Sequence, residues 1–246
     1  MLLYFIRHGD PIYDPNCLTP LGKRQAEALA RRLALYGLDK IYMSGSNRAM
    51  ETAAPTLELL KKEGTILDWA DEQHAWDEMS VSLPDGGRTW LFYTKEAREI
   101  LTSREIRRLG DDWHEHPYFK GSDFAKGHLR IRRETRFFLR KLGFDFDEGK
   151  GRYKNLHYRE DGTSDLKEQR VALFAHHGFG TNFVSSVLDI PYPQICLKTN
   201  YAHSTLTIIR FREDEEYVIP EMLTMSNDGH LLADRLPTKY NNELYF

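Results

Sequence analysis

Short runs of apolar residues along the chain are bounded by polar or turn-forming residues. This pattern is typical of strands that are buried on both faces of a sheet. A weaker run of the same kind lies at Thr65–Trp69. The clear runs predict strands at Leu2–Ile6, Lys40–Met43, Val171–Ala175 and Thr205–Phe211.

Segments with apolar residues at helical spacing lie between these runs. The first has Thr19 as a capping residue and ends at Gly37, and both are common helix-end signals. A second helix is expected at about 46–62, and a third is expected to follow Gly180 and to end before Pro191. Alternation of strands and helices predicts an α/β fold, with a mixed, mainly parallel sheet flanked by helices on both faces.

The middle of the chain, at about 86–149, interrupts this alternation. It is rich in charged and aromatic residues, has helical patterning and shows no convincing strand. We interpret it as a mostly helical lobe inserted over the ligand-binding edge of the sheet, within a single α/β domain that spans 1–246. The polar stretch Asp147–Glu168 is expected to be a loop or a short hairpin.

The composition is that of an ordinary globular protein, with 246 residues, 41% of them hydrophobic and 29% charged. Cys17 and Cys196 are too few for a disulfide framework, which favours a reducing, cytoplasmic environment. The chain start lacks the features of a signal peptide, and no apolar stretch is long enough to cross a membrane, so no membrane partner is expected. The net charge of -3 argues against binding to nucleic acid.

Two of the apolar runs end in nearly the same way. Arg7 and His8, followed by a glycine, end the first run, and His176 and His177, again followed by a glycine, end the run at Val171–Ala175. Ligands of open α/β sheets bind beyond the carboxyl ends of the strands. A lone histidine at a strand end usually has a structural role. Two at matched positions, one of them beside an arginine, favour a functional site.

A further motif follows the run at Lys40–Met43. A short segment of small residues leads into the second helix and puts Arg48 in its first turn. A helix N-terminus offers free N–H groups and a partial positive charge, and arginine adds a planar pair of donors. The arrangement favours an anion-binding site, with a surface arginine on a capped helix as the alternative.

In their order along the chain, these motifs resemble those of the histidine phosphatase superfamily, whose branches include the cofactor-dependent phosphoglycerate mutases. The resemblance spans residues 2 to about 180, apart from the inserted lobe. The matching motifs are Arg-His-Gly at 7–9, Leu-Thr-Pro-Leu-Gly at 18–22, Arg-Ala-x-x-Thr-Ala at 48–53, and the late strand that ends in histidine. The resemblance implies phosphoryl transfer through a phosphohistidine on His8.

Elementary chemistry supports this mechanism. Attack on phosphorus needs an unprotonated ring nitrogen, and the positive charges of Arg7 and Arg48 disfavour the imidazolium form of His8. The same arginines would bind and neutralise the phosphoryl oxygens in the transition state. By the resemblance, His176, which directly follows its strand, is the second histidine at the phosphoryl group, in preference to His177.

A proton donor for the leaving oxygen is also needed. By the resemblance, it is a carboxylic acid on the loop after the third strand, commonly in the order apolar residue, spacer, glutamate. Trp76-Asp77-Glu78 fits this order, so Glu78 is the candidate, with Asp77, Glu72 and Asp71 as alternatives. The apolar neighbours of Glu78 would keep its carboxyl protonated enough to act as an acid.

Other polar residues are expected around the site or on the surface. His177 and His203, which precedes the last strand, are candidates for a shell around the reacting groups. Arg132, Arg136 and Arg140 lie at four-residue spacing and predict a solvated helix face paired with acids, with presentation to an anionic substrate as the alternative. No spacing matches a metal site or a dinucleotide-binding loop, so no metal and no cofactor are predicted.

The sequence therefore predicts a metal-independent phosphatase that acts on a small phosphate monoester. The alternatives are a mutase-like phosphotransferase and a non-catalytic phosphate-binding module. The segment 79–84 does not resemble the mutase version, and Asp14 stands where many relatives carry asparagine, which favours hydrolysis. Because no candidate catalytic residue is missing, a non-catalytic module is disfavoured. The sequence identifies neither the substrate nor the oligomeric state.

Overall fold

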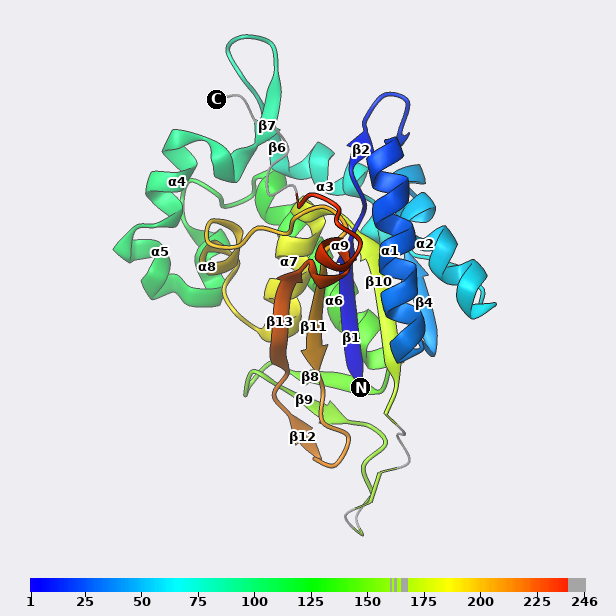
Figure 1. Cartoon of the computed structure of the whole chain (residues 1–246). Helices are drawn as coiled ribbons and strands as arrows, with labels where there is room; N and C mark the ends of the chain where they lie inside the picture. Colours follow the sequence, from blue (N-terminus) through cyan, green and yellow to red (C-terminus); the bar gives the residue numbers. More distant parts are fainter. Residues whose placement is uncertain (160, 162, 165–167, 239–246) are drawn as a thin grey trace.

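The computed structural model describes residues 1–159, 161, 163–164 and 168–238, and in these a six-stranded sheet carries helices on both faces (Figure 1). The strand order is β13-β11-β1-β10-β4-β5. β1, β10, β4 and β5 run parallel, and β11 and β13 are antiparallel to their neighbours. The mixed, mainly parallel sheet predicted from the sequence is thus confirmed. Its strands are β1 Leu2–Arg7, β4 Lys40–Met43, β5 Thr65–Ile66, β10 Arg170–Ala175, β11 Leu206–Arg210 and β13 Glu221–Asn227.

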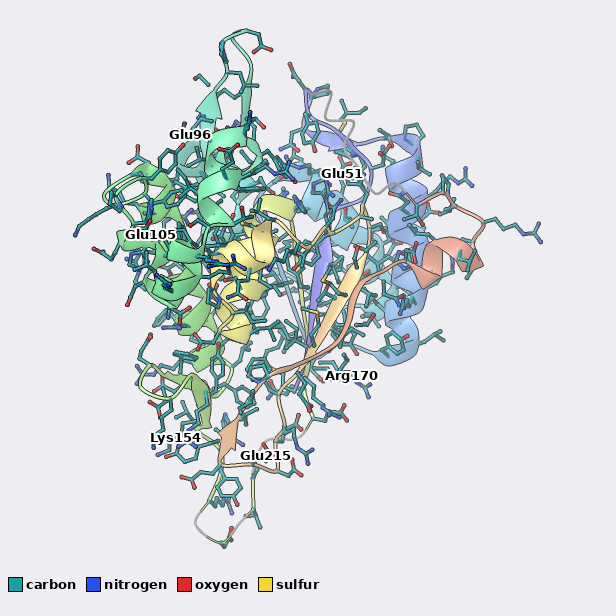
Figure 2. The ribbon with its side chains drawn as sticks, turned by 90° about the vertical axis from the view of Figure 1, so that its left-hand side faces the viewer. Glu51, Glu96, Glu105, Lys154, Arg170 and Glu215 are labelled. Carbon is teal, nitrogen blue, oxygen red and sulfur yellow. The ribbon has the colours of Figure 1, made fainter. Side chains whose placement is uncertain are left out.

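Three small sheets complete the strands of the described residues. They are formed by β2 Pro11–Ile12 with β3 Cys17–Leu18, by β6 Ser80–Ser82 with β7 Arg88–Trp90, and by β8 Phe144–Asp147, β9 Arg152–Asn155 and β12 Tyr217–Val218. In Figure 1 the β2–β3 and β6–β7 hairpins project beyond the upper end of the main sheet, and the β12-β9-β8 sheet lies at the lower end. In Figure 2, Lys154 and Glu215 mark this lower end.

Helices cover both faces of the main sheet and form most of the lobe. They are α1 Pro20–Tyr36, α2 Asn47–Leu60, α3 Glu72–Met79, α4 Lys95–Leu101, α5 Arg104–Leu109, α6 Asp123–Lys141, α7 His177–Leu188, α8 Tyr192–Cys196 and α9 Gly229–Ala233. Short 3-10 helices lie at Asp68–Ala70, Leu91–Tyr93 and Gly110–Glu115. Over the described part of the chain, no helix combines the length and apolar character needed to span a membrane.

The core follows from the alternation of side chains along β1, because successive residues of a strand point to opposite faces. Leu3 and Phe5 pack in the cluster that includes aromatic residues of α6 and α7, with the ring centroids of Phe5 and Phe183 5.7 Å apart. Tyr4 and Ile6 pack on the other face, in the cluster that includes residues of α1 and α2. Both faces of β1 are therefore buried, and the carboxyl end of the strand is fixed between two layers of helices.

The cap predicted for α1 is present. The Thr19 side chain accepts a hydrogen bond from the N–H of Gly22 at 3.0 Å, and the chain leaves the helix at Gly37. Gly22 also permits close packing against the segment after β1, since a Cβ there would collide with the carbonyl oxygen of Asp10. The start of α1 thereby packs closely against the backbone of the loop that follows β1.

α7 begins at His177 and not after Gly180 as predicted. Glycines usually weaken helices, so the glycines of this segment favoured a later start. Here they are needed for close packing inside the helix. A Cβ on Gly180 would collide with the Phe5 ring, and one on Gly178 would collide with Trp90. The helix therefore starts directly after His176, at the end of β10.

The third strand is shorter than predicted. β5 ends at Ile66, and the chain passes through a 3-10 turn into α3, where a loop was expected. Asp71 caps α3, because its carboxylate accepts a hydrogen bond from the N–H of Gln73 at 2.9 Å. The acids considered as proton donors consequently belong to one helix: Asp71 is its N-cap, and Glu72, Asp77 and Glu78 lie within it.

The segment 86–149, which the sequence predicts to be an inserted lobe, contains α4, α5 and α6, in keeping with its helical pattern. It also contains β7 and β8, which the sequence did not predict. Glu96 and Glu105 mark the lobe in Figure 2, on the side away from α1. The stretch Asp147–Glu168, expected to be a loop or a short hairpin, contains β9 and only the last residue of β8, with which β9 pairs. Residues 160, 162 and 165–167 of this stretch lie outside the described residues.

Candidate active site

His8 directly follows β1 and is held from three sides. Its N–H donates to the carbonyl oxygen of Ala175 at 3.0 Å, and its carbonyl oxygen accepts from the N–H of Ser204 at 2.9 Å. The next residue, Gly9, donates its N–H to Thr52 Oγ1 at 2.9 Å. The ends of β1 and β10, the start of α2 and the segment before β11 thus converge on one buried histidine.

The protonation state of His8 follows from its hydrogen bond. The Nδ1 atom lies 2.7 Å from the carbonyl oxygen of Gly9. Because a carbonyl oxygen can only accept, Nδ1 carries the proton and Nε2 carries a lone pair. Burial, followed by the charges of His176 and Arg7, lowers the pKa of His8 well below its usual value. The ring is therefore neutral at pH 7, with a nucleophilic nitrogen.

Arg7 is buried at the end of β1. Its Nη1 donates to the carbonyl oxygen of Tyr201, and its Nη2 donates to His203 Nε2 at 2.8 Å. Burial lowers the pKa of Arg7 to about 10, so the guanidinium keeps its charge at neutral pH. The bonds to Tyr201 and His203 hold the cation beside His8, whose ring centroid lies 5.6 Å from that of His203.

Arg48 lies in the first turn of α2, as predicted. Its Nη1 donates to Asn16 Oδ1 at 3.0 Å, and its guanidinium lies 5.4 Å from the centroid of the Tyr13 ring, within range of a cation–π contact. Both partners come from the loop between β2 and β3. Glu51, labelled in Figure 2, accepts from the N–H of Leu18 at 2.7 Å and ties this hairpin to α2.

His176 directly follows β10, and its ring centroid lies 5.2 Å from that of His8. Its Nε2 is 2.8 Å from Ser44 Oγ. Ser44 Oγ also accepts from the N–H of Ser46 at 3.2 Å, and its hydroxyl can either donate to Nε2 or accept from it. Burial, followed by the charges of Arg48 and Arg7, lowers the pKa of His176 well below its usual value.

Glu72, and not Glu78, is the acid beside this cluster. Glu72 Oε2 lies 3.5 Å from His176 Nδ1, within ion-pair range but without a hydrogen bond, and Oε1 accepts from the N–H of Phe179 at 3.1 Å. Glu78 instead accepts from Arg130 on α6, at 2.7 to 3.0 Å.

Helix geometry separates the two glutamates. Six residues of α-helix place Glu78 about 9 Å further along α3 and about 120° around it from Glu72. The sequence pattern led to Glu78 because the helix start at Asp71 was not predicted. With that start, Ala70-Asp71-Glu72 shows the same order of apolar residue, spacer and glutamate.

The ring nitrogens of His177 contact Tyr93 and Tyr201. Its Nε2 lies 3.1 Å from the hydroxyl of Tyr93, in the inserted lobe, and its Nδ1 accepts from the N–H of Tyr201 at 3.5 Å. Burial, followed by the charge of Arg7, lowers the pKa of His177 to about 3. The structure therefore places His177 in the surrounding shell, between the site and the lobe.

Sequence reasoning did not identify Ser44 or Asn16. A signal for Asn16 was present, since it lies two residues after Asp14, the position where many relatives carry asparagine. Ser44 could be found only with the strand pairing in hand, because β4 and β10 are neighbours that are far apart in the sequence. Among the described residues, no group of three or more His, Cys, Asp or Glu side chains is arranged to hold a metal ion. The cluster offers donors and positive charge to an anion and a nucleophilic nitrogen beside them.

Comparison with known proteins agrees with this site. Residues 3–83 match the model of the histidine phosphatase superfamily, branch 1. The matched segment holds Arg7, His8, Arg48 and Glu72, and the resemblance inferred from the sequence is thereby confirmed. A search of curated proteins found no match.

Solved structures share the fold. A mycobacterial glucosyl-3-phosphoglycerate phosphatase with inorganic phosphate has a TM-score of 0.56 at 18% identity, over 93% of this chain and 98% of that one. A phosphoserine phosphatase from Entamoeba histolytica has a TM-score of 0.56 at 15% identity, over 94% and 98%. The α-ribazole phosphatase of Shigella flexneri has 0.54 at 16%, over 93% and 97%. At such identities the likeness establishes the fold alone.

Proposed function

We propose that this chain is a phosphatase that hydrolyses a small phosphate monoester through a phosphohistidine on His8. The observation that carries the proposal is the hydrogen bond from His8 Nδ1 to the Gly9 carbonyl, at 2.7 Å. It leaves the Nε2 lone pair available in a buried cluster with Arg7, Arg48 and His176. A neutral imidazole among fixed cations is suited to attack a phosphoryl group whose oxygens those cations neutralise.

The reaction has two steps with balanced bonds and protons. In the first, the His8 Nε2 lone pair forms a bond to phosphorus while the bond from phosphorus to the ester oxygen breaks, and that oxygen takes a proton from Glu72. In the second, water attacks phosphorus, the phosphorus–nitrogen bond breaks, and the Glu72 carboxylate takes a proton from the water. The products are an alcohol and inorganic phosphate, and His8 returns to its neutral form.

Each remaining group has a role in this scheme. Arg7, Arg48 and a ring N–H of His176 donate to the phosphoryl oxygens, which carry the charge in a loose transition state. The position of Glu72, 3.5 Å from His176 Nδ1, supports its assignment as the general acid and base. Phosphatases acting on small phosphorylated compounds occur among proteins of the same fold, which fits hydrolysis.

A turnover assay with a generic aryl phosphate tests the proposal. The wild-type chain should release phosphate, and His8→Ala should lose nearly all activity while remaining folded, because binding energy cannot replace the nucleophile. Activity should persist with a chelator, since the arginines already supply positive charge to the phosphoryl group. Full activity in His8→Ala, or complete loss with EDTA that a divalent ion restores, would overturn the scheme.

A further inference from the structure

Arg7 has an unusual acceptor. Its Nη2 donates to His203 Nε2 at 2.8 Å, and both side chains are buried. Guanidinium groups only donate, so His203 must accept at Nε2 and carry its ring proton on Nδ1. This arrangement requires a neutral His203, because an imidazolium would present a second donor and a second positive charge to Arg7.

A carboxylate lies on the far side of the His203 ring. Asp10 Oδ1 is 3.6 Å from His203 Nδ1, too long for a hydrogen bond but close enough for charge to orient the ring dipole. Asp10 Oδ2 accepts from Thr19 Oγ1 at 2.7 Å, and Thr19 caps α1. Asp10, His203 and Arg7 thus form a row that leads from the cap of α1 to the phosphate-binding guanidinium.

The backbone that carries His203 is also fixed. Ser204, the next residue, has φ of 61°, in the left-handed region that non-glycine residues rarely adopt. Its N–H donates to the carbonyl oxygen of His8 at 2.9 Å. Strained backbone of this kind persists where its surroundings hold it, often at functional sites. The hydrogen bond to His8 joins the segment that carries His203 to the end of β1.

We propose that His203, oriented by Asp10, is the positioning residue that sets the plane of the Arg7 guanidinium for binding a phosphoryl group. Asp10 favours the ring orientation and tautomer that leave Nε2 as an acceptor, and Nε2 fixes one edge of the guanidinium. The inference rests on the proposed function for the identity of the anion.

A matched pair of amide variants tests this proposal. His203→Gln places an amide oxygen near the position of Nε2, whereas His203→Asn is one methylene shorter and does not reach Arg7. His128→Gln, which replaces a buried histidine of the lobe that bonds to Asn182, is the control. For each protein, the affinity for inorganic phosphate is measured by calorimetry, and kcat and KM are measured with an aryl phosphate. The Tm of each variant is measured to check that it is folded.

The expected result separates the two amides. His203→Asn should weaken phosphate binding by about 10- to 100-fold and raise KM more than it lowers kcat, in line with the loss of a charge-assisted hydrogen bond. His203→Gln and His128→Gln should bind phosphate within about threefold of wild type. Wild-type affinity in His203→Asn, or equal weakening in both His203 variants, would overturn the positioning role.

The same measurements separate this inference from the proposed function. If the wild-type chain binds phosphate in a manner that depends on residue 203 but releases none from any ester, the proposed phosphatase activity fails and the positioning role stands. If the chain hydrolyses esters and His203→Asn does so with unchanged KM, the positioning role fails and the activity stands.

Discussion

Arginines occur in two regions of this molecule, and they differ in their partners. At the carboxyl end of the main sheet, Arg7 donates to a backbone carbonyl and to His203, and Arg48 donates to the amide oxygen of Asn16. On α6, in the lobe, each arginine of the predicted stripe contacts carboxylates. The contacts pair Arg132 with Asp111, Glu148 and Asp189, Arg136 with Glu148 and Asp189, and Arg140 with Asp145.

This difference shows which arginines can serve an anionic ligand. Arg48 donates to an amide oxygen, and the charge of Asp71 acts on it without a hydrogen bond between them. A guanidinium that is not hydrogen-bonded to a carboxylate keeps positive charge for an incoming phosphoryl group. A guanidinium paired with carboxylates is already compensated. Releasing Arg132 or Arg136 would also leave the half-buried Asp189 without a partner. The alternative in which the α6 stripe meets the substrate is therefore disfavoured, and the stripe joins the lobe to the loop after α7.

The two regions can also be compared through two glutamates of α3. Glu72 lies beside His176 in the site, whereas Glu78 pairs with Arg130 on α6. Glu72→Gln should slow hydrolysis of an alkyl phosphate by about 10²–10⁴-fold and affect an aryl phosphate with an acidic phenol much less, since that oxygen leaves without a proton. Glu78→Gln should leave both rates within about threefold. Rates are compared as kcat/KM on the two substrates.

Equal losses on both substrates in Glu72→Gln would mean that Glu72 binds or positions and does not protonate. A strong, substrate-dependent loss in Glu78→Gln, with Glu72→Gln unaffected, would return the role to Glu78. The two variants remove the same charge from the same helix, so each serves as the control for the other.

A matched pair of arginine variants tests the two regions directly. Arg48→Gln should lower kcat/KM by about 10²–10³-fold, because it removes a donor to the charge that develops on the phosphoryl oxygens. Arg130→Gln should leave kcat/KM nearly unchanged and lower the free energy of unfolding by about 1–3 kcal/mol, because Glu78 loses its partner. Kinetics and chemical denaturation of the two proteins check this contrast, and equal kinetic losses would contradict it.

Buried histidines in both regions should make stability depend on pH. Burial lowers the pKa of His128 to about 3 in the folded lobe, whereas an unfolded chain has a histidine pKa of about 6.5. Below pH 6.5 the unfolded state therefore takes up a proton that the folded state does not. As the pH is lowered below about 6.5, the free energy of unfolding therefore decreases, by about 1.4 kcal/mol per pH unit for this residue.

In His128→Gln the slope between pH 6 and pH 4 should be smaller by that amount, while the pH profile of activity stays as in wild type. Denaturant titrations at several pH values measure the slope. An unchanged slope would contradict the neutral, buried state of His128, and a changed activity profile would tie the lobe histidine to the chemistry.

The sequence was sufficient for the inner strands of the sheet and for the meeting of Arg7, His8, Arg48 and His176. Buried parallel strands appear as continuous apolar runs, and polar residues directly after such runs gather at one edge. The glutamate nearest to His176 could not be identified, because its position depended on the start of α3 at Asp71. A capping carboxylate there looks no different from any other loop acid in the sequence.

Tertiary packing explains the other differences. Gly178 and Gly180 read as helix breakers, yet both lie inside α7, where close contact with Trp90 and Phe5 requires them. β13 was not predicted, and its burial shows why. As the edge strand beside β11, it is mostly half-buried and exposed at Glu221 and Leu223, so it lacks the continuous apolar run of the inner strands.

Trapping the phosphorylated protein tests the central claim most directly. Wild-type protein mixed with labelled aryl phosphate and quenched in alkali within the first turnover should carry a phosphate that is stable to base and labile to acid. Peptide mapping should find it on His8, and ³¹P NMR should assign it to Nε2, the nitrogen that the Gly9 carbonyl leaves unprotonated. Phosphate on another residue, or steady hydrolysis with no phosphoenzyme at any quench time, would contradict the account.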